Sequence, residues 1–347
     1  MFARKKPLVW SRFWQNKINA RVFNAARIYN KPMWENIVHH IRYYARYHAG
    51  KWQASPHYRS LLALVIITSL GCPGCKFGDN SQGDDVLLGH IQKRGYLRVG
   101  INYNNPPFGS LTKHSTSEAN ASYRAEGFDV DLSQAIAAAL LPEGKHPIRF
   151  RQVLTSTRLV ALNTQSVDLI AAAMSITEAR RQRVDFSVPY FEVHQKMLVP
   201  KESLLIEVTG PIGKLRNALS GKTILTVNGS TTQARIQMLF PSARIKGYAT
   251  LNEAFAGLQT GEGDALSNDD VLLSGLLQNH CDLQKKFRML PYALSDESYG
   301  LAFRKSGQRP DSKSLQKSVN RILARFKKDG TLEKLKHRWL NPGNCRS

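Results

Sequence analysis

The sequence predicts an α/β fold of two lobes, in which the second lobe is inserted into the first. Strand and helix patterns alternate from Gly95 to the C-terminal end, which is typical of parallel sheets covered by helices. Two extended segments, 196–200 and 298–304, flank the second α/β set, so the chain is expected to cross twice between lobes. Beyond an N-terminal segment, about 270 residues remain, enough for two lobes of roughly 100–150 residues each.

The first α/β set begins with a strand at 96–101, a segment rich in residues that favour strands. A helix is expected at 128–141, because apolar residues recur there every three or four positions. The pattern then predicts a strand at 148–153, a short helix at 158–163 and a fully buried strand at 167–173.

The second set repeats this alternation without any detectable internal sequence repeat. Apolar runs of strand length alternate with amphipathic runs of helix length. The expected strands are 223–227, 244–248 and 264–267, the expected helices between and after them are 232–240, 251–259 and 270–279, and the closing helices are 312–328 and 331–339.

The N-terminal segment reads as a targeting signal rather than as part of the fold. Residues 1–60 hold twelve Lys or Arg and one acid, and an apolar run follows at 61–71. Such a run is too short for a membrane span, which takes about 20 residues, but it suits the core of a signal peptide. Ser69-Leu-Gly-Cys72 resembles a lipoprotein cleavage box, so Cys72 is a candidate for lipidation; the alternative is a short buried helix. We assign 1–72 as basic leader plus signal-type segment and 73–92 as a linker.

The formal net charge of +23 favours an anionic small ligand, a membrane surface or nucleic acid. Nucleic acid is not expected, because neither zinc-finger spacing nor a basic helix with heptads occurs. The sequence also lacks a Gly-rich phosphate loop, an ordered Ser/His/Asp set and a His/Cys cluster at metal-ligand spacing. We therefore expect no cofactor, no metal and no catalytic residue.

Several short motifs occur in a fixed order between about residues 92 and 341. They are Leu97-Arg-Val-Gly100, Pro106-Pro-Phe108, Gly127-Phe-Asp-Val-Asp131, Val167-Asp-Leu-Ile170, Met174-Ser-Ile-Thr177, Val184-Asp-Phe-Ser187, Gly229-Ser-Thr-Thr232 and Gly330-Thr-Leu332. This ordered set resembles the family 3 extracellular solute-binding proteins of amino-acid ABC transporters.

The resemblance implies a type II-like periplasmic binding protein fold, in which two α/β lobes joined by a two-strand hinge close over a ligand. Lobe 1 would contain 93–197 and 301–342, and lobe 2 would contain 198–300. Such a protein is a periplasmic monomer, either free or anchored through a lipidated Cys72. Its partners would be a small amino acid and an ABC permease in the inner membrane.

The resemblance also assigns the groups that would hold the carboxylate of an amino acid. Arg180, in Thr177-Glu-Ala-Arg, matches the family's carboxylate clamp, and a guanidinium makes two parallel charge-assisted hydrogen bonds. Ser175 and Thr177 would lie beside the same carboxylate. Ser230 and Thr231 of the other lobe begin a helix, whose free N–H groups attract anions. On spacing alone, Arg180 would instead be a solvated helix residue.

Other matching positions concern the ammonium group and the ligand side chain. Asp269 matches the family's ammonium-binding acid, with Asp270 as the alternative. Arg158 resembles the arginine that meets acidic or amide side chains, which favours glutamate or aspartate and leaves glutamine open. Asn105 stands where many binders of basic amino acids have an aromatic residue, which argues against those ligands. Phe108 would be an apolar wall of the site or part of the core.

The cysteine positions carry a second resemblance. Cys281 and Cys345 are placed like a cysteine pair in the ligand-binding cores of ionotropic glutamate receptors, which are relatives of this family. The resemblance implies a Cys281–Cys345 disulfide; two unpaired thiols are the alternative, and Cys75 stays unassigned.

Two other functions remain open on the same fold. One is an enzyme similar to cyclohexadienyl dehydratases, and the other is a periplasmic amino-acid sensor without transport.

Overall fold

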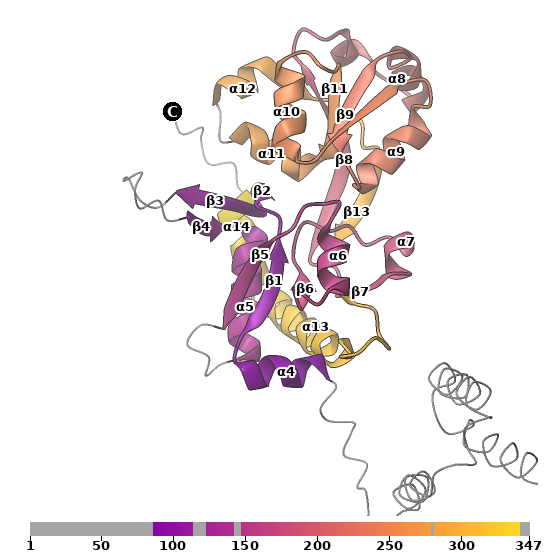
Figure 1. Cartoon of the computed structure of the whole chain (residues 1–347). Helices are drawn as coiled ribbons and strands as arrows, with labels where there is room; N and C mark the ends of the chain where they lie inside the picture. Colours follow the sequence, from indigo (N-terminus) through magenta and orange to yellow (C-terminus); the bar gives the residue numbers. More distant parts are fainter. Residues whose placement is uncertain (1–85, 114–122, 142–146, 279–280, 341–347) are drawn as a thin grey trace, which may run out of the picture. The chain divides into compact units, whose positions relative to one another are not determined.

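The computed structural model describes residues 86–113, 123–141, 147–278 and 281–340. Within these ranges the chain forms two lobes, each with its own central sheet (Figure 1). Lobe 1 takes the described residues of 86–190 and 300–340, and lobe 2 takes those of 191–299. The inserted lobe and the mixed α/β class agree with the fold class that the sequence predicts.

The sheet of lobe 1 has five strands in the order β5-β1-β6-β14-β7. Strand β1 runs parallel to β5 and β6, and β14 runs antiparallel to β6 and β7. The strands are β1 (Leu97–Ile101), β5 (Ile148–Gln152), β6 (Leu169–Ile170), β7 (Val184–Phe186) and β14 (Ala302–Arg304). The helices are α4 (Leu87–Arg94), α5 (Phe128–Leu140), α6 (Arg158–Asn163), α7 (Glu178–Arg181), α13 (Lys313–Lys328) and α14 (Thr331–Leu340).

Lobe 1 also carries a small antiparallel sheet that the sequence patterns do not predict. Its three strands are β2 (Asn104–Asn105), β3 (Gly109–Lys113) and β4 (Tyr123–Glu126), in the order β2-β3-β4. The exposed residues of β3 and β4 lack the alternation of apolar and polar side chains that marks a half-buried strand.

The main path of the lobe 2 sheet follows the order β10-β9-β11-β8-β12, and β13 also pairs with β8. Strands β9, β10 and β11 are parallel, whereas β8 is antiparallel to its partners. The strands are β8 (Phe191–Pro200), β9 (Thr223–Val227), β10 (Arg244–Tyr248), β11 (Ala265–Asp269), β12 (Phe287–Met289) and β13 (Ser295–Tyr299). The helices are η2 (Leu204–Glu207), α8 (Ile212–Ala218), α9 (Thr231–Leu239), α10 (Leu251–Gln259), α11 (Asp270–Gln278) and α12 (Cys281–Lys286).

Strands β8 and β13 form an antiparallel pair where the chain passes between the lobes (Figure 1). The sequence predicts one extended segment at 298–304, but the structure divides it after Tyr299. Strand β13 belongs to the lobe 2 sheet and β14 to the lobe 1 sheet, so the chain must change partners between them. Gly300 lies at this change, and a Cβ there would meet Ile176 Cδ1 at 2.8 Å.

Two other expectations need correction. Residues of the expected linker 73–92 form the first turn and a half of α4, because Leu87 and Ile91 are buried in the apolar core of lobe 1. The expected strand 167–173 is buried throughout, yet only Leu169–Ile170 pairs as a strand. The backbone leaves the strand conformation before Ala173, which has a φ of 44°.

The targeting segment 61–71 and three of the cysteines (Cys72, Cys75 and Cys345) lie outside the described residues. Cys281 is the first residue of α12. Across the described ranges, every helix is too short or too polar to cross a membrane.

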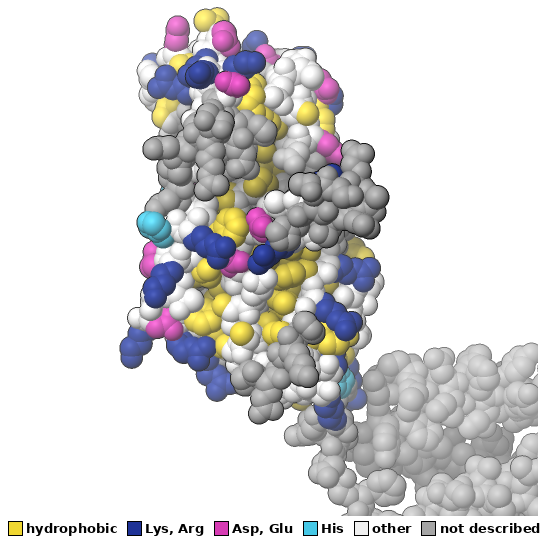
Figure 2. Space-filling view, turned by 90° about the vertical axis from the view of Figure 1, so that its left-hand side faces the viewer, with side chains coloured by type: hydrophobic (Ala, Val, Ile, Leu, Met, Phe, Trp, Pro, Cys, Tyr) yellow, Lys and Arg dark blue, Asp and Glu magenta, His cyan; other side chains and the backbone are white. Residues whose placement is uncertain are grey.

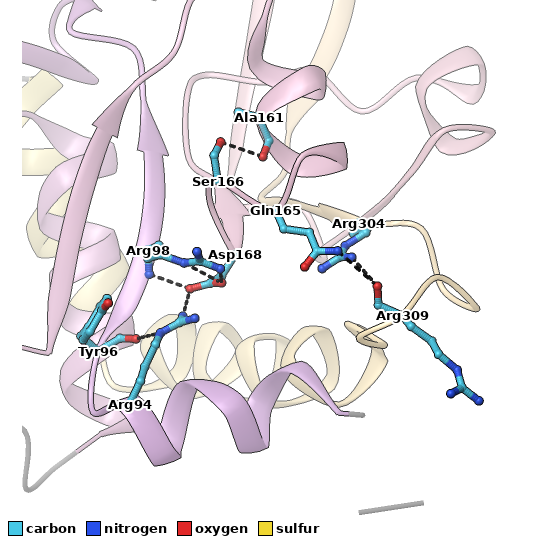
Figure 3. Close-up of polar contacts among 9 residues, drawn as sticks. All are labelled: Arg94, Tyr96, Arg98, Ala161, Gln165, Ser166, Asp168, Arg304 and Arg309. Atoms are coloured by element: carbon cyan, nitrogen blue, oxygen red, sulfur yellow. Dashed lines mark hydrogen bonds and ion pairs between the residues drawn. The ribbon is translucent and has the colours of Figure 1, made fainter. Parts of the chain in front are cut away.

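A buried carboxylate ties α4 to the sheet of lobe 1 (Figure 3). The Asp168 side chain is fully buried and accepts hydrogen bonds from the Arg98 backbone N–H at 2.7 Å and the Arg98 guanidinium at 2.8 Å. The Arg94 guanidinium, from the end of α4, binds the same carboxylate. Removing such a carboxylate leaves two partly buried cations without a partner.

We expect Asp168→Ala to lower the free energy of unfolding by about 3–5 kcal/mol, because it breaks a buried ion pair from one side. Urea denaturation would measure the change. The control is Glu333→Ala, which removes the exposed pair with Lys336 and should cost under about 1 kcal/mol. Equal effects of the two substitutions would contradict the structural role of Asp168.

Candidate functional site

A small cavity lies between the two lobes and is lined mainly by polar side chains. Lobe 1 and lobe 2 both contribute to its wall. The lining residues are Asn105, Thr155, Arg158, Ala173, Ser175 and Arg180 from lobe 1, and Val227, Ser230, Thr231, Thr232, Asn268, Asp269 and Leu272 from lobe 2. The cavity thus brings together seven of the nine ligand-binding residues that the resemblance assigns.

The other two assigned residues lie elsewhere. The Thr177 hydroxyl accepts the Arg180 backbone N–H at 3.2 Å and so caps the N-terminus of α7. The Phe108 ring is 1% exposed and packs against Phe128 and Tyr299, with ring centroids 5.4 and 5.3 Å apart. Phe108 is therefore part of the core, the second of the two roles expected for it. Thr177 holds the backbone of Arg180 in position.

Arg180 reaches from lobe 1 to lobe 2. One guanidinium nitrogen, Nη1, donates to the Ser175 carbonyl at 2.8 Å, and Nη2 donates to the Gly229 carbonyl at 3.4 Å. Burial lowers the pKa of Arg180, whereas Glu297 and Asp269 raise it. The group is thus a partly buried cation with donors to spare for an anion.

Arg158, the first residue of α6, is a second cation in the cavity wall and is only 3% exposed. Its Nη1 donates to the Ala172 carbonyl at 2.9 Å, and it forms no ion pair with any acid in the described ranges. Burial and, to a smaller extent, the nearby charge of Arg180 lower its pKa to about 9, although Tyr299 and Asp269 act in the opposite direction. The guanidinium remains charged at neutral pH and makes no direct ion pair with the described residues.

Asp269 ends strand β11 and lines the cavity. The Tyr299 hydroxyl donates to Oδ2, whereas buried Oδ1 has no hydrogen-bond partner in the described part of the chain. Burial raises the pKa of Asp269 to about 7. Its neighbour Asp270 points elsewhere and accepts the His194 backbone N–H at 3.2 Å. An unpartnered carboxylate oxygen of this kind suits an ammonium group.

The N-terminus of α9 forms the facing wall in lobe 2. The Ser230 hydroxyl caps the helix by accepting the Gln233 N–H at 3.0 Å. The Thr231 hydroxyl lies 3.5 Å from the Ser175 hydroxyl of lobe 1. The free N–H groups and the partial positive charge of this helix start would favour an anionic group in the cavity.

Two polar residues on the crossing strands were missed by the sequence reasoning. Gln195 of β8 and Glu297 of β13 are hydrogen-bonded to each other at 2.9 Å, and both bind the Thr231 hydroxyl. The Oε1 atom of Gln195 is buried without a partner among the described residues. Both residues lie in or next to expected extended segments, but a polar residue in a strand usually faces solvent, so sequence offers little signal.

Asp129 holds the loop that leads into the cavity. Its carboxylate accepts the Tyr190 hydroxyl and the Ala173 N–H, both at 2.7 Å. The residue is buried, which raises its pKa to about 7. The left-handed backbone of Ala173 is thereby fixed just before Ser175.

The described ranges hold no group of three or more His, Cys, Asp or Glu side chains placed to bind a metal ion. The cavity wall has the groups of a clamp, with two guanidinium groups, a helix start and one carboxylate oxygen. These groups match the two charged ends of an amino acid.

Comparison with known proteins identifies similar chains. The sequence profile of the bacterial extracellular solute-binding proteins, family 3, matches residues 97–342. The ABC transporter glutamine-binding protein GlnH of Bacillus subtilis is 31% identical over 281 residues, which cover 81% of this chain and 94% of GlnH. The glutamine-binding protein of Geobacillus stearothermophilus is 33% identical, with coverages of 75% and 94%.

The glutamate-binding protein GluB of Corynebacterium glutamicum is 27% identical, over 79% of this chain and 85% of GluB. Among solved structures, an ancestral amino acid-binding protein, a precursor of cyclohexadienyl dehydratase, superimposes with a TM-score of 0.62 at 28% identity, over 74% of this chain and all of that protein. The arginine-binding protein of T. maritima in its holo form gives a TM-score of 0.57 at 27% identity, over 71% of this chain and 97% of that one.

The raised pKa of Asp269 predicts how the stability of the ligand-free protein depends on pH. A buried carboxyl whose pKa rises from 3.8 to about 7 stabilises the fold below pH 3.8, and this contribution is lost as the pH rises through 7. We expect Asp269→Asn to raise the free energy of unfolding at pH 8 by about 1–3 kcal/mol relative to the wild type, since it removes the buried charge.

Urea denaturation at pH 5 and pH 8 would measure this effect, with Asp270→Asn, outside the cavity wall, as the matched control. The gain should be larger at pH 8 than at pH 5 and absent from the control. If the wild type is more stable than Asp269→Asn at pH 8, the buried charge of Asp269 does not destabilise the fold, and the prediction is wrong.

Proposed function

The chain belongs to the bacterial extracellular solute-binding proteins of family 3, and we propose that it binds a polar amino acid outside the cytoplasm for an ABC permease. One observation supports this best: the Arg180 guanidinium and Asp269, whose Oδ1 has no hydrogen-bond partner among the described residues, line the same cavity. These groups are complementary to a carboxylate and an ammonium group, respectively.

The proposed pose places the α-carboxylate between Arg180 and the start of α9. The carboxylate would accept from the guanidinium, from the Ser175 hydroxyl and from N–H groups at Thr231. The ammonium group would donate to Asp269 Oδ1. Because Arg180 and Ser175 belong to lobe 1 and the other two groups to lobe 2, one ligand would hold both lobes together.

The side chain of the ligand is proposed to meet Arg158. A buried guanidinium that makes no direct ion pair with the described residues is best stabilised by a second carboxylate, which favours glutamate or aspartate. Glutamine is the alternative, since its side-chain carbonyl also accepts from Arg158, and the relatives named for glutamine support it. Binding rather than catalysis is proposed because the cavity keeps both halves of an amino-acid clamp.

Two proposals involve Cys72 and Cys345, which lie outside the described ranges. We retain a disulfide between Cys281 and Cys345 and lipidation of Cys72 as hypotheses. Mass spectrometry of non-reduced peptides would test the first, and metabolic labelling with palmitate would test the second.

Thermal melting with each of the twenty amino acids tests the function. A ligand at 1,000 times its dissociation constant stabilises the folded state by about 4 kcal/mol, which raises the melting temperature by several degrees. We expect the largest shift with glutamate or aspartate and a smaller one with glutamine. If none of the twenty shifts the melting temperature, amino-acid binding is wrong, and prephenate and arogenate become the next ligands to test.

Substitutions of the two arginines should separate affinity from specificity. We expect Arg180→Lys to weaken every amino-acid ligand by about 100-fold, because the paired guanidinium hydrogen bonds are lost. Arg158→Gln should lower the preference for glutamate over glutamine by about tenfold or more, because a neutral donor no longer favours the second charge.

Isothermal titration calorimetry would measure both changes. The matched control is Arg183→Gln, an exposed residue of lobe 1 near α7, which should leave binding unchanged. An unchanged ratio of glutamate to glutamine affinity in Arg158→Gln would show that Arg158 does not read the ligand side chain.

A further inference from the structure

The two lobes differ sharply in charge. The described residues of lobe 1 include 23 Lys or Arg and 9 Asp or Glu, whereas those of lobe 2 include 11 of each kind. Lobe 2 is therefore neutral and lobe 1 carries an excess of fourteen positive charges. On the face drawn in Figure 2, dark blue Lys and Arg side chains recur over the lower lobe, with hydrophobic side chains between them.

Much of this excess lies on one side of helix α13. Apolar residues on the opposite side, among them Leu315, Val319 and Phe326, are buried in the core. The outward side holds a basic face, which we define as the exposed residues Lys313, Lys317, Arg321, Arg325 and Lys328. The helix contains no Asp or Glu.

The charges of the basic face repel one another. Lys313, Lys317, Arg321 and Arg325 follow at intervals of four residues, which places like charges side by side on the helix. No acid among the described residues forms an ion pair with any of the four. An anionic partner would relieve this repulsion, whereas folding of lobe 1 does not require such a partner.

A groove runs beside the basic face, between α4, α5 and α13. Its wall is apolar at Leu88, Leu140 and Ile322, and Arg321 and Arg325 also line it. Apolar surface next to two guanidinium groups suits a phospholipid, whose phosphate needs cations and whose glycerol and chain region is apolar.

The basic face also lies close to the point where the chain enters lobe 1. Helix α4, which begins the lobe, packs against α13, and both lie at the end of lobe 1 away from lobe 2 (Figure 1). The apolar run 61–71 ends fifteen residues before Val86. A lipid on Cys72, as hypothesised above, would leave fourteen residues (72–85) before Val86, which span at most about 50 Å and keep the start of lobe 1 near the membrane surface.

We propose that the basic face of α13, with the groove beside it, docks lobe 1 on a membrane surface of anionic phospholipids. Lipid phosphates would be bound by Arg321 and Arg325, and the remaining charges would add long-range attraction. The interaction is independent of the ligand in the cavity and therefore goes beyond the proposed transport function.

Covalent labelling of lysines in the full chain tests the docking directly. The chain is incubated with phosphatidylcholine vesicles, with or without phosphatidylglycerol, labelled with an amine-reactive ester and analysed by mass spectrometry. We expect phosphatidylglycerol to protect Lys313, Lys317 and Lys328 and to leave the exposed lobe 2 residues Lys201 and Lys214 unprotected. Equal labelling of α13 with both kinds of vesicle overturns the proposal and favours an acidic protein as the partner.

Charge reversal supplies the second test. Combined Lys317→Glu, Arg321→Glu and Arg325→Glu should weaken the affinity for anionic vesicles roughly tenfold or more, since each basic residue near the surface adds to the attraction.

The control combines Lys201→Glu, Lys214→Glu and Lys285→Glu in lobe 2, which changes the net charge equally. The leader residues 1–60 are common to both variants, so the difference reports the basic face alone. If both variants lose the same affinity for anionic vesicles, the effect depends on net charge alone and the proposal is overturned. The shift of the melting temperature with amino acid should be the same in both variants, which separates this test from that of the cavity.

Discussion

The carboxylate of Asp129 is the contact on which the geometry of the cavity depends. It joins α5 to the strand end at Tyr190 and to the backbone at Ala173, with two hydrogen bonds of 2.7 Å. Ala173 adopts a left-handed backbone that a β-carbon disfavours, so this conformation needs a partner that compensates for its strain. Once the loop is fixed there, Ser175 pairs with Tyr299 of the crossing strand, and the Ser175 carbonyl accepts from Arg180. One buried acid of the Gly127–Asp131 motif thus links α5 to the clamp.

The electrostatics of the cavity wall favour a zwitterionic ligand. Burial opposes the charged form of Arg158, Arg180 and Asp269, because each pKa is shifted toward the neutral species. Only a few direct contacts cross the cavity, among them Arg180 to the Gly229 carbonyl and the Ser175 hydroxyl to the Thr231 hydroxyl, at 3.4 and 3.5 Å. Both distances are at the long end for hydrogen bonds. A ligand that brings a carboxylate and an ammonium group would add direct partners for these guanidinium groups and for Asp269 Oδ1, which has no hydrogen-bond partner among the described residues.

The sequence predicted the regular elements well where their signal is local. Strands 223–227 and 244–248 and helices 158–163 and 251–259 have the bounds expected from periodicity, and α10 also carries a capping box of Thr250 and Glu253. The prediction failed where tertiary contacts determine the backbone conformation. Strand 167–173 shortened because Ala173 turns toward Asp129. The prediction of the cavity residues was limited in the same way. The sequence identified charged residues that belong to recognisable motifs. It did not identify Gln195 and Glu297, because only the pairing of β8 with β13 brings these two residues together.

The unequal charge of the lobes is compatible with a hinge at β8 and β13. If both lobes were equally basic, attraction to an anionic surface would act on each of them, and any rotation of one lobe would change its electrostatic energy. A neutral lobe 2 avoids this coupling, because its distance from the surface has little effect on the total energy. The basic face also lies at the end of lobe 1 away from lobe 2, so docking would leave the cavity accessible. Lobe 1 could therefore be held at a membrane while lobe 2 moves over the ligand, and the affinity for amino acid would not depend on the composition of the membrane.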